Sequence, residues 1–218
     1  MSNINEEYIE EYIRSILPKN DDYLVELEKY SKENHIPIVH PEVANFLKVM
    51  IKITKAEKIL ELGTAIGYSA LIMANAMESK GKIVTIERRE DMIELAKENI
   101  KNSETNVDIE IIKGEAQKVL PSINDEFDLI FLDAAKSKYM DFLPYCINNL
   151  KTRGIIISDN VLFKGMVAND QLVVRRKKTI VRRMREYLEY ISNNEELETS
   201  VIPIGDGIAL SYKKEVQK

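Results

Sequence analysis

The stretch Phe127-Asp-Leu-Ile-Phe-Leu-Asp-Ala-Ala-Lys136 indicates both the fold and a first candidate site. Its apolar run, residues 129–132, is typical of a strand buried on both faces, as in a parallel sheet. The run ends at Asp133, and Lys136 follows three residues later. Ligands of open α/β sheets bind at the carboxyl ends of the strands. Asp133 and Lys136 are therefore candidates for chemistry.

The composition is that of a globular protein with a substantial core. The chain has 218 residues, of which 44% are hydrophobic and 31% are charged, and both fractions are ordinary for such proteins. No apolar run approaches the roughly 20 residues of a membrane helix, and the acid-rich first residues do not resemble a signal peptide. The single cysteine, Cys146, excludes an intramolecular disulfide and is expected to be a small buried hydrophobe. We expect a cytoplasmic protein.

The chain is predicted to form one domain, residues 1–218, with a helical cap at residues 1–56 and a Rossmann-like core at residues 57–218. The cap has no strand pattern, and its apolar residues at helical spacing predict three helices. These helices are expected at residues 4–16, 21–31 and 41–53.

From residue 58 onward, strand and helix patterns alternate, and a predicted basic helix at residues 170–190 precedes two further strands. The order predicts an α/β fold, a doubly wound sheet of seven strands that ends in an antiparallel hairpin with a tight turn. The predicted strands are residues 58–62, 82–86, 107–112, 127–132, 154–158, 200–204 and 208–212.

A glycine-containing turn follows the first of these strands. Gly63 and Gly67 could have a purely structural role, and their spacing departs from the dinucleotide fingerprint. However, Glu87 ends the next strand, where a carboxylate can accept two hydrogen bonds from a ribose diol. The turn and the acid together predict a cofactor that contains a nucleoside.

Oxygen-bearing side chains end two strands that are expected to be neighbours in the sheet. Asp133 ends one strand, and Asp159 and Asn160 end the other. Each residue alone could simply cap a helix, but three hard oxygen ligands at one sheet edge suit Mg²⁺ or a similar divalent cation. His35 and His40 have no partner at metal-ligand spacing, so zinc is not expected.

Three segments resemble the metal-dependent O-methyltransferases that use S-adenosylmethionine, which include catechol and caffeoyl-CoA O-methyltransferases. They are residues 59–69, 131–136 and 157–160. Within this family the chain is most similar to bacterial tRNA 5-hydroxyuridine methyltransferases, which form 5-methoxyuridine at wobble position 34. The segments behind this narrower resemblance are residues 36–39, 160–165, 175–178 and 201–209.

The resemblance implies a role for each matching residue. It implies Mg²⁺ ligands at Asp133, Asp159 and Asn160, and a general base at Lys136. The residues that it implies for S-adenosylmethionine binding are Val39, Glu61, Gly63, Ser69, Glu87, Glu115, Ala116 and Asp133.

A block of seven basic residues bears on the substrate, because the protein as a whole carries a net charge of −5. The block could be a solvated outer face, but cations without intervening acids are better explained by phosphate contacts. Its members are Arg175, Arg176, Lys177, Lys178, Arg182, Arg183 and Arg185. We expect the first four to contact tRNA.

Two alternatives to a tRNA methyltransferase remain open. The first is an O-methyltransferase for a small catechol or phenol, although the catechol branch has an aromatic residue where this chain has Ala135. The second is a binding protein that has lost catalysis, which the intact Asp133, Lys136, Asp159 and Asn160 argue against. The amphipathic first helix and the resemblance also predict a homodimer.

Overall fold

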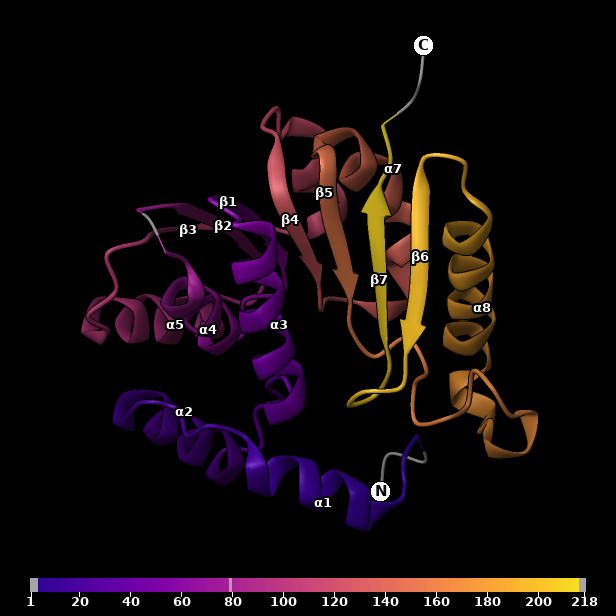
Figure 1. Ribbon diagram of the computed structural model, residues 1–218, viewed down its shortest axis with the longest axis horizontal. Helices are drawn as coiled ribbons and strands as arrows, with labels where there is room; N and C mark the ends of the chain where they lie inside the picture. Colours follow the sequence, from indigo (N-terminus) through magenta and orange to yellow (C-terminus); the bar gives the residue numbers. More distant parts are fainter. Residues whose placement is uncertain (1–3, 79, 216–218) are drawn as a thin grey trace.

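The computed structural model describes residues 4–78 and 80–215 and contains a mixed seven-stranded sheet covered by helices on both faces (Figure 1). The strand order is β3-β2-β1-β4-β5-β7-β6. The strands are β1 (Lys58–Leu62), β2 (Lys82–Glu87), β3 (Asp108–Lys113), β4 (Phe127–Leu132), β5 (Leu150–Ser158), β6 (Leu197–Ile202) and β7 (Ile208–Lys213). The first five are parallel, and β7 pairs antiparallel with both β5 and β6. The predicted Rossmann-like sheet with an antiparallel hairpin is confirmed.

Alternate residues of the central strands pack on opposite faces of the sheet. Ile59 and Leu129 contact one hydrophobic core, whereas Leu60 and Ile130 contact the other. The helices of the first face are α2 (Asp22–Glu33), α3 (Pro41–Thr54), α4 (Tyr68–Ala76) and α5 (Glu90–Asn102). Those of the second face are α6 (Ala116–Val119), α7 (Tyr139–Asn149) and α8 (Lys178–Asn193). Burial of both faces explains the uninterrupted apolar run in β4.

The first helix, α1 (Glu7–Ile16), has no buried residue and lies with α2 beneath the carboxyl ends of the parallel strands (Figure 1). Arg14 attaches α1 to the rest of the chain through two hydrogen bonds to the buried Glu42 carboxylate, at 2.9 and 2.8 Å. The helices at residues 4–56 thus extend the protein below the edge where ligands of α/β sheets bind.

Several boundaries differ from the prediction, among them the start of β6, which begins at Leu197 rather than residue 200. β6 ends at Ile202 rather than residue 204, because Pro203 has no N–H to donate to the ladder, and the hairpin connection is a five-residue loop rather than a tight turn. β5 begins at Leu150 rather than residue 154. Helix α8 begins at Lys178, so the preceding basic residues form a separate 3₁₀ turn, η4 (Arg175–Lys177).

Cys146 lies fully buried in the second core, as predicted. Burial raises the pKa of its thiol to about 12, so the thiol stays protonated at neutral pH. No described helix combines the length and hydropathy needed to cross a bilayer.

Candidate active site

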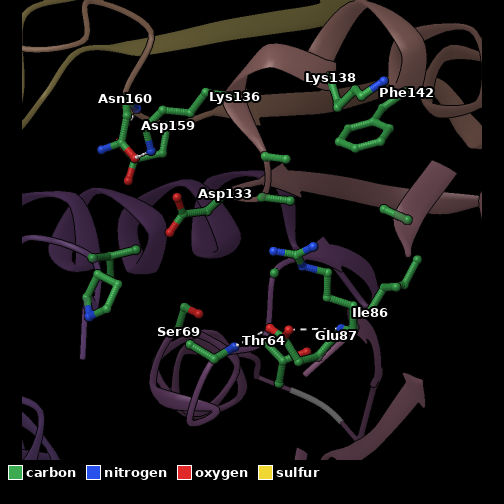
Figure 2. Close-up of a pocket in the computed structure, with 18 of the residues that line it drawn as sticks. Thr64, Ser69, Ile86, Glu87, Asp133, Lys136, Lys138, Phe142, Asp159 and Asn160 are labelled. Atoms are coloured by element: carbon green, nitrogen blue, oxygen red, sulfur yellow. Dashed lines mark hydrogen bonds between the residues drawn. The ribbon is translucent and has the colours of Figure 1, made fainter. Parts of the chain in front are cut away.

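A cavity of about 700 Å³ opens at the carboxyl ends of the parallel strands, next to the point where the strand order reverses between β1 and β4. Its position is that expected for the ligand site of a doubly wound sheet. The predicted site residues that line it are Val39, Gly63, Ser69, Glu87, Glu115, Ala116, Asp133, Lys136, Asp159 and Asn160. Figure 2 shows Asp133, Lys136, Asp159 and Asn160 grouped on one side, across from Thr64, Ser69 and Glu87.

Gly63 brings the backbone of the β1–α4 turn against the end of β4. Its φ is +105°, and a Cβ atom at this position would lie 2.4 Å from the carbonyl oxygen of Asp133. Because no larger residue fits, this turn requires glycine for steric reasons as well as for its conformation. The turn and Asp133 therefore form one continuous wall of the cavity.

Glu87 is held in a fixed orientation at the end of β2. One carboxylate oxygen accepts a hydrogen bond from the Ala65 amide at 3.1 Å, and the other accepts from the amides of Arg88 and Arg89 at 2.8 and 2.9 Å. The Ala65 contact ties Glu87 to the glycine turn. The predicted pairing of turn and acid is thus present in the structure.

Glu61 does not line the cavity but lies fully buried beneath it. Its carboxylate accepts hydrogen bonds from the Ser69 hydroxyl at 2.5 Å and the Thr85 hydroxyl at 2.6 Å. Burial raises the pKa of Glu61 to about 7, although both hydrogen bonds oppose the rise. Ser69, which does line the cavity, connects this buried carboxyl to it.

The three predicted metal ligands lie together. Asp133 ends β4 with part of its surface open to the cavity, whereas Asp159 is only 1% exposed. Burial raises the pKa of Asp133 to about 6. Burial and then the nearby Asp133 carboxylate raise the pKa of Asp159 well above its ordinary value.

This donor set fits a hard divalent cation. Lys136 lowers the pKa of both carboxyls, but its effect does not offset their burial, so the site favours additional positive charge. No group of three His, Cys, Asp or Glu side chains suitable for a metal occurs in the part of the chain that the structure describes. The third protein ligand would therefore be the amide oxygen of Asn160.

Lys136 lies in the 3₁₀ turn η2 (Lys136–Lys138) directly beside these ligands. Its Nζ donates a hydrogen bond to Oδ1 of Asn160. The predicted general base therefore lies against one of the predicted metal ligands.

Several residues that line the cavity, and Tyr139 directly behind it, were not predicted from the sequence. The Tyr139 hydroxyl lies 2.8 Å from the Leu132 carbonyl oxygen and 3.0 Å from that of Asp159, so it joins the ends of β4 and β5 from behind. Lys138 and Phe142 are four residues apart, the spacing that brings two side chains to one face of a helix, so the sequence could have indicated that they lie together. The lining residues that were not predicted include Thr64, Tyr68, Ile86, Arg88, Lys138 and Phe142.

The basic block lies outside the cavity, and only part of it is available for a ligand. Arg175, Arg176 and Lys178 are exposed, and their side chains have no hydrogen bond or ion pair with any residue that the structure describes. Lys177 instead lies over the Phe163 ring, with Nζ 5.5 Å from the ring centroid. The block's remaining members bind within the chain, where Arg182 pairs with Glu186, Arg183 donates to the Ser137 carbonyl, and Arg185 pairs with Asp170.

The chain matches an O-methyltransferase family over residues 14–214. It is 28% identical over 225 residues to a catechol O-methyltransferase of Niastella koreensis, with 98% of this chain and 100% of that protein covered. It is 29% identical over 220 residues to a caffeoyl-CoA O-methyltransferase of Populus kitakamiensis, covering 95% and 94% of the two chains.

The structure is also similar to the crystal structure of an O-methyltransferase from Bacillus cereus in complex with SAH. The TM-score is 0.83 and the identity 27%, with 95% of this chain and 97% of that chain covered. Together with the strand order and the cavity, these matches show that the chain belongs to the S-adenosylmethionine-dependent O-methyltransferase family that includes the catechol and caffeoyl-CoA enzymes.

Proposed function

We propose that this protein transfers the methyl group of S-adenosylmethionine to a hydroxyl oxygen of a substrate with two adjacent oxygens, and that it uses Mg²⁺. The observation that carries the proposal is the grouping of Asp133, Asp159, Asn160 and Lys136 at one side of a cavity whose other side is the glycine turn and Glu87. Two adjacent substrate oxygens could reach a cation at the first group while the cofactor occupies the second.

The cavity residues divide between the parts of the cofactor. Gly63 would allow close approach of its methionine end, which Ser69 would contact and Val39 would cover from the cap, while the buried Glu61 would act only through its hydrogen bond from Ser69. Glu87 would accept hydrogen bonds from the ribose. Glu115 and Ala116 would border the adenine.

The reaction needs no covalent intermediate with the protein. When bound, the cofactor supplies the methyl group and the cation stabilises the deprotonated substrate oxygen. Lys136 would accept the proton of the substrate hydroxyl, and its hydrogen bond to Asn160 holds Nζ at the ligand site. The rigid ends of β4 and β5 would align the substrate oxygen with the methyl group.

A small catechol or phenol is the acceptor that the named relatives support. The cavity volume of about 700 Å³ lies in the range for small-molecule sites. Phe142 provides an aromatic surface on one wall, but Ala135 leaves the position before Lys136 open. The acceptor would therefore be held mainly through its two oxygens.

A second candidate acceptor is 5-hydroxyuridine in tRNA, in which the hydroxyl lies next to the O4 carbonyl. The exposed and unpartnered Arg175, Arg176 and Lys178 favour it, because such cations bind a phosphate backbone. The open position at Ala135 is compatible with a base at the end of a polymer loop. Lys177 contributes less, because it is stacked on Phe163.

Methyl transfer from labelled S-adenosylmethionine tests both candidates. The purified protein with Mg²⁺ is given either a catechol or tRNA from cells that lack 5-methoxyuridine. Labelled catechol supports the first acceptor and labelled tRNA the second, whereas transfer to neither refutes the proposed reaction. Transfer that persists in EDTA refutes the role of the metal.

A charge-reversal variant separates the acceptors further. Arg175→Glu/Arg176→Glu should reduce methylation of tRNA and flatten its salt dependence, while catechol methylation stays unchanged. Arg153→Glu is the matched control, because Arg153 is exposed near the opposite end of β5. Unchanged tRNA methylation in the double variant would refute contact between the basic turn and tRNA.

We also propose that the protein is a homodimer. Helix α1 exposes Tyr8, Tyr12 and Ile16, each more than 60% accessible. Sedimentation equilibrium of the wild type and of Tyr12→Glu tests this, and a monomeric wild type would refute it.

A further inference from the structure

The loop at residues 203–207, between β6 and β7, has no part in the proposed reaction, yet it contains a buried carboxylate. Asp206 is 8% exposed, and its Oδ1 accepts a hydrogen bond from the backbone amide of Lys164. Lys164 lies four residues after Asn160, in the segment that leaves the metal-ligand site. A buried carboxylate bound to that segment calls for an explanation.

The loop contacts this segment along its length. The Val161 amide donates to the Gly207 carbonyl at 2.9 Å, and the Leu162 amide donates to the Asp206 carbonyl at 3.0 Å. Gly207 has a φ of +87°, and a Cβ atom there would lie 2.4 Å from Cγ of Leu162. The two chain segments are therefore as close as their backbones permit.

The segment that the loop holds has a strained backbone. Asn160, Phe163 and Lys164 have φ values of +58°, +44° and +56°. Asparagine tolerates this left-handed conformation, but it is unfavourable for phenylalanine and lysine. Such strain persists only where the surroundings hold it in place, and it concentrates at functional sites.

The loop is itself held firmly from the other side. A Cβ atom at Gly205 would lie 2.7 Å from Cγ2 of Val43 in α3, and the residue that follows the loop, Ile208, is fully buried. The loop is thus fixed between the helical cap and residues 161–164, so Asp206 can act as a rigid support.

We infer that Asp206 is a positioning residue for the metal site, whose carboxylate holds the Lys164 amide and thereby keeps the 160–164 turn in the conformation that presents Asp159 and Asn160. This inference rests on the proposed metal-dependent function. It predicts that the hydrogen-bond acceptor at position 206 matters much more than the negative charge.

The inference is tested by measuring how tightly the full chain binds Mn²⁺. The electron paramagnetic resonance signal of free Mn²⁺ reports how much of the ion remains unbound. Asp206→Ala should weaken Mn²⁺ affinity by about 10- to 100-fold, as loss of an outer-shell partner does. Asp206→Asn should remain close to wild type, because its amide oxygen accepts the same hydrogen bond. Asp170→Ala is the matched control, since Asp170 is an exposed carboxylate that pairs with Arg185.

Hydrogen exchange supplies a measurement that does not involve the metal. The Lys164 amide should exchange faster in Asp206→Ala than in Asp206→Asn or the wild type. Binding of S-adenosylhomocysteine without metal, measured by calorimetry, should be equal in the wild type and both variants, because no residue proposed to contact the cofactor lies in the 160–164 turn.

Two results would overturn the inference. One is wild-type Mn²⁺ affinity in Asp206→Ala, and the other is an equal loss in Asp206→Ala and Asp206→Asn, which would assign the effect to charge. If Asp206→Ala does not fold, weakened Mn²⁺ binding by a folded Asp206→Asn likewise overturns it. A wild-type protein that binds no Mn²⁺ would refute the proposed metal dependence as well.

Discussion

Replacing Glu61 with glutamine should stabilise the ligand-free protein at alkaline pH and have little effect in acid. The Glu61 side chain is fully buried, and its hydrogen bonds from Ser69 and Thr85 do not prevent a rise of its pKa to about 7. Ionisation of this carboxyl therefore places an unfavourable charge inside the native protein.

The sign and size of this effect on stability follow from the pKa values of Glu61 in the native protein and in the unfolded chain. The native carboxyl binds its proton more tightly than the unfolded chain, whose ordinary value is 4.5. The resulting stabilisation is fully present below pH 4.5 and is lost as the pH rises through about 7. The gap between the two values corresponds to about 3 kcal/mol. Glutamine is neutral at every pH, so the stability of Glu61→Gln should not fall as the pH rises through about 7.

Urea denaturation of both proteins between pH 4.5 and pH 8, without cofactor or metal, measures the difference in free energy of unfolding. The advantage of Glu61→Gln should grow from near zero to at most about 3 kcal/mol. Glu57→Gln, at an exposed position four residues earlier, is the control and should show no such trend. A difference that is constant with pH would refute the reasoning, as would a wild type that is the more stable protein at pH 8.

Substitutions at three further positions test the site and the helical cap. Gly63→Ala should lose cofactor binding in calorimetry and unfold at lower urea, because its Cβ would overlap the Asp133 carbonyl; normal binding would contradict this. Tyr139→Phe should cost about 1 kcal/mol in urea denaturation through its lost hydrogen bonds, and no cost would contradict their importance. Arg14→Ala should cost about 2 kcal/mol, because it leaves the buried Glu42 unpaired, whereas Arg14→Lys should recover part of the loss.

Residues at strand ends were predictable from the sequence, because each strand's apolar run shows where its carboxyl end lies. Glu87 and Asp133 follow such a run directly, Asp159 follows one after the single residue Ser158, and parallel strands bring their ends to one edge. The cavity indeed contains all three.

Residues from helices and loops were less predictable. Tyr68 and Phe142 reach the cavity only because α4 and α7 pack at particular angles on the sheet, which periodicity does not specify. The pairing of Arg185 with Asp170 likewise depends on how the chain folds back before α8. The early end of β6 was visible in principle, because Pro203 cannot donate a ladder hydrogen bond.

The contact between Gly63 and the Asp133 carbonyl has a thermodynamic consequence. Because the two backbones touch, a shift of the glycine turn on cofactor binding would also displace Asp133, the first of the proposed cation ligands. If the cofactor changes the affinity for the cation by some factor, the cation must then change the affinity for the cofactor by the same factor. Cofactor and cation should therefore be treated as linked ligands, whose dissociation constants have meaning only at a stated concentration of the other.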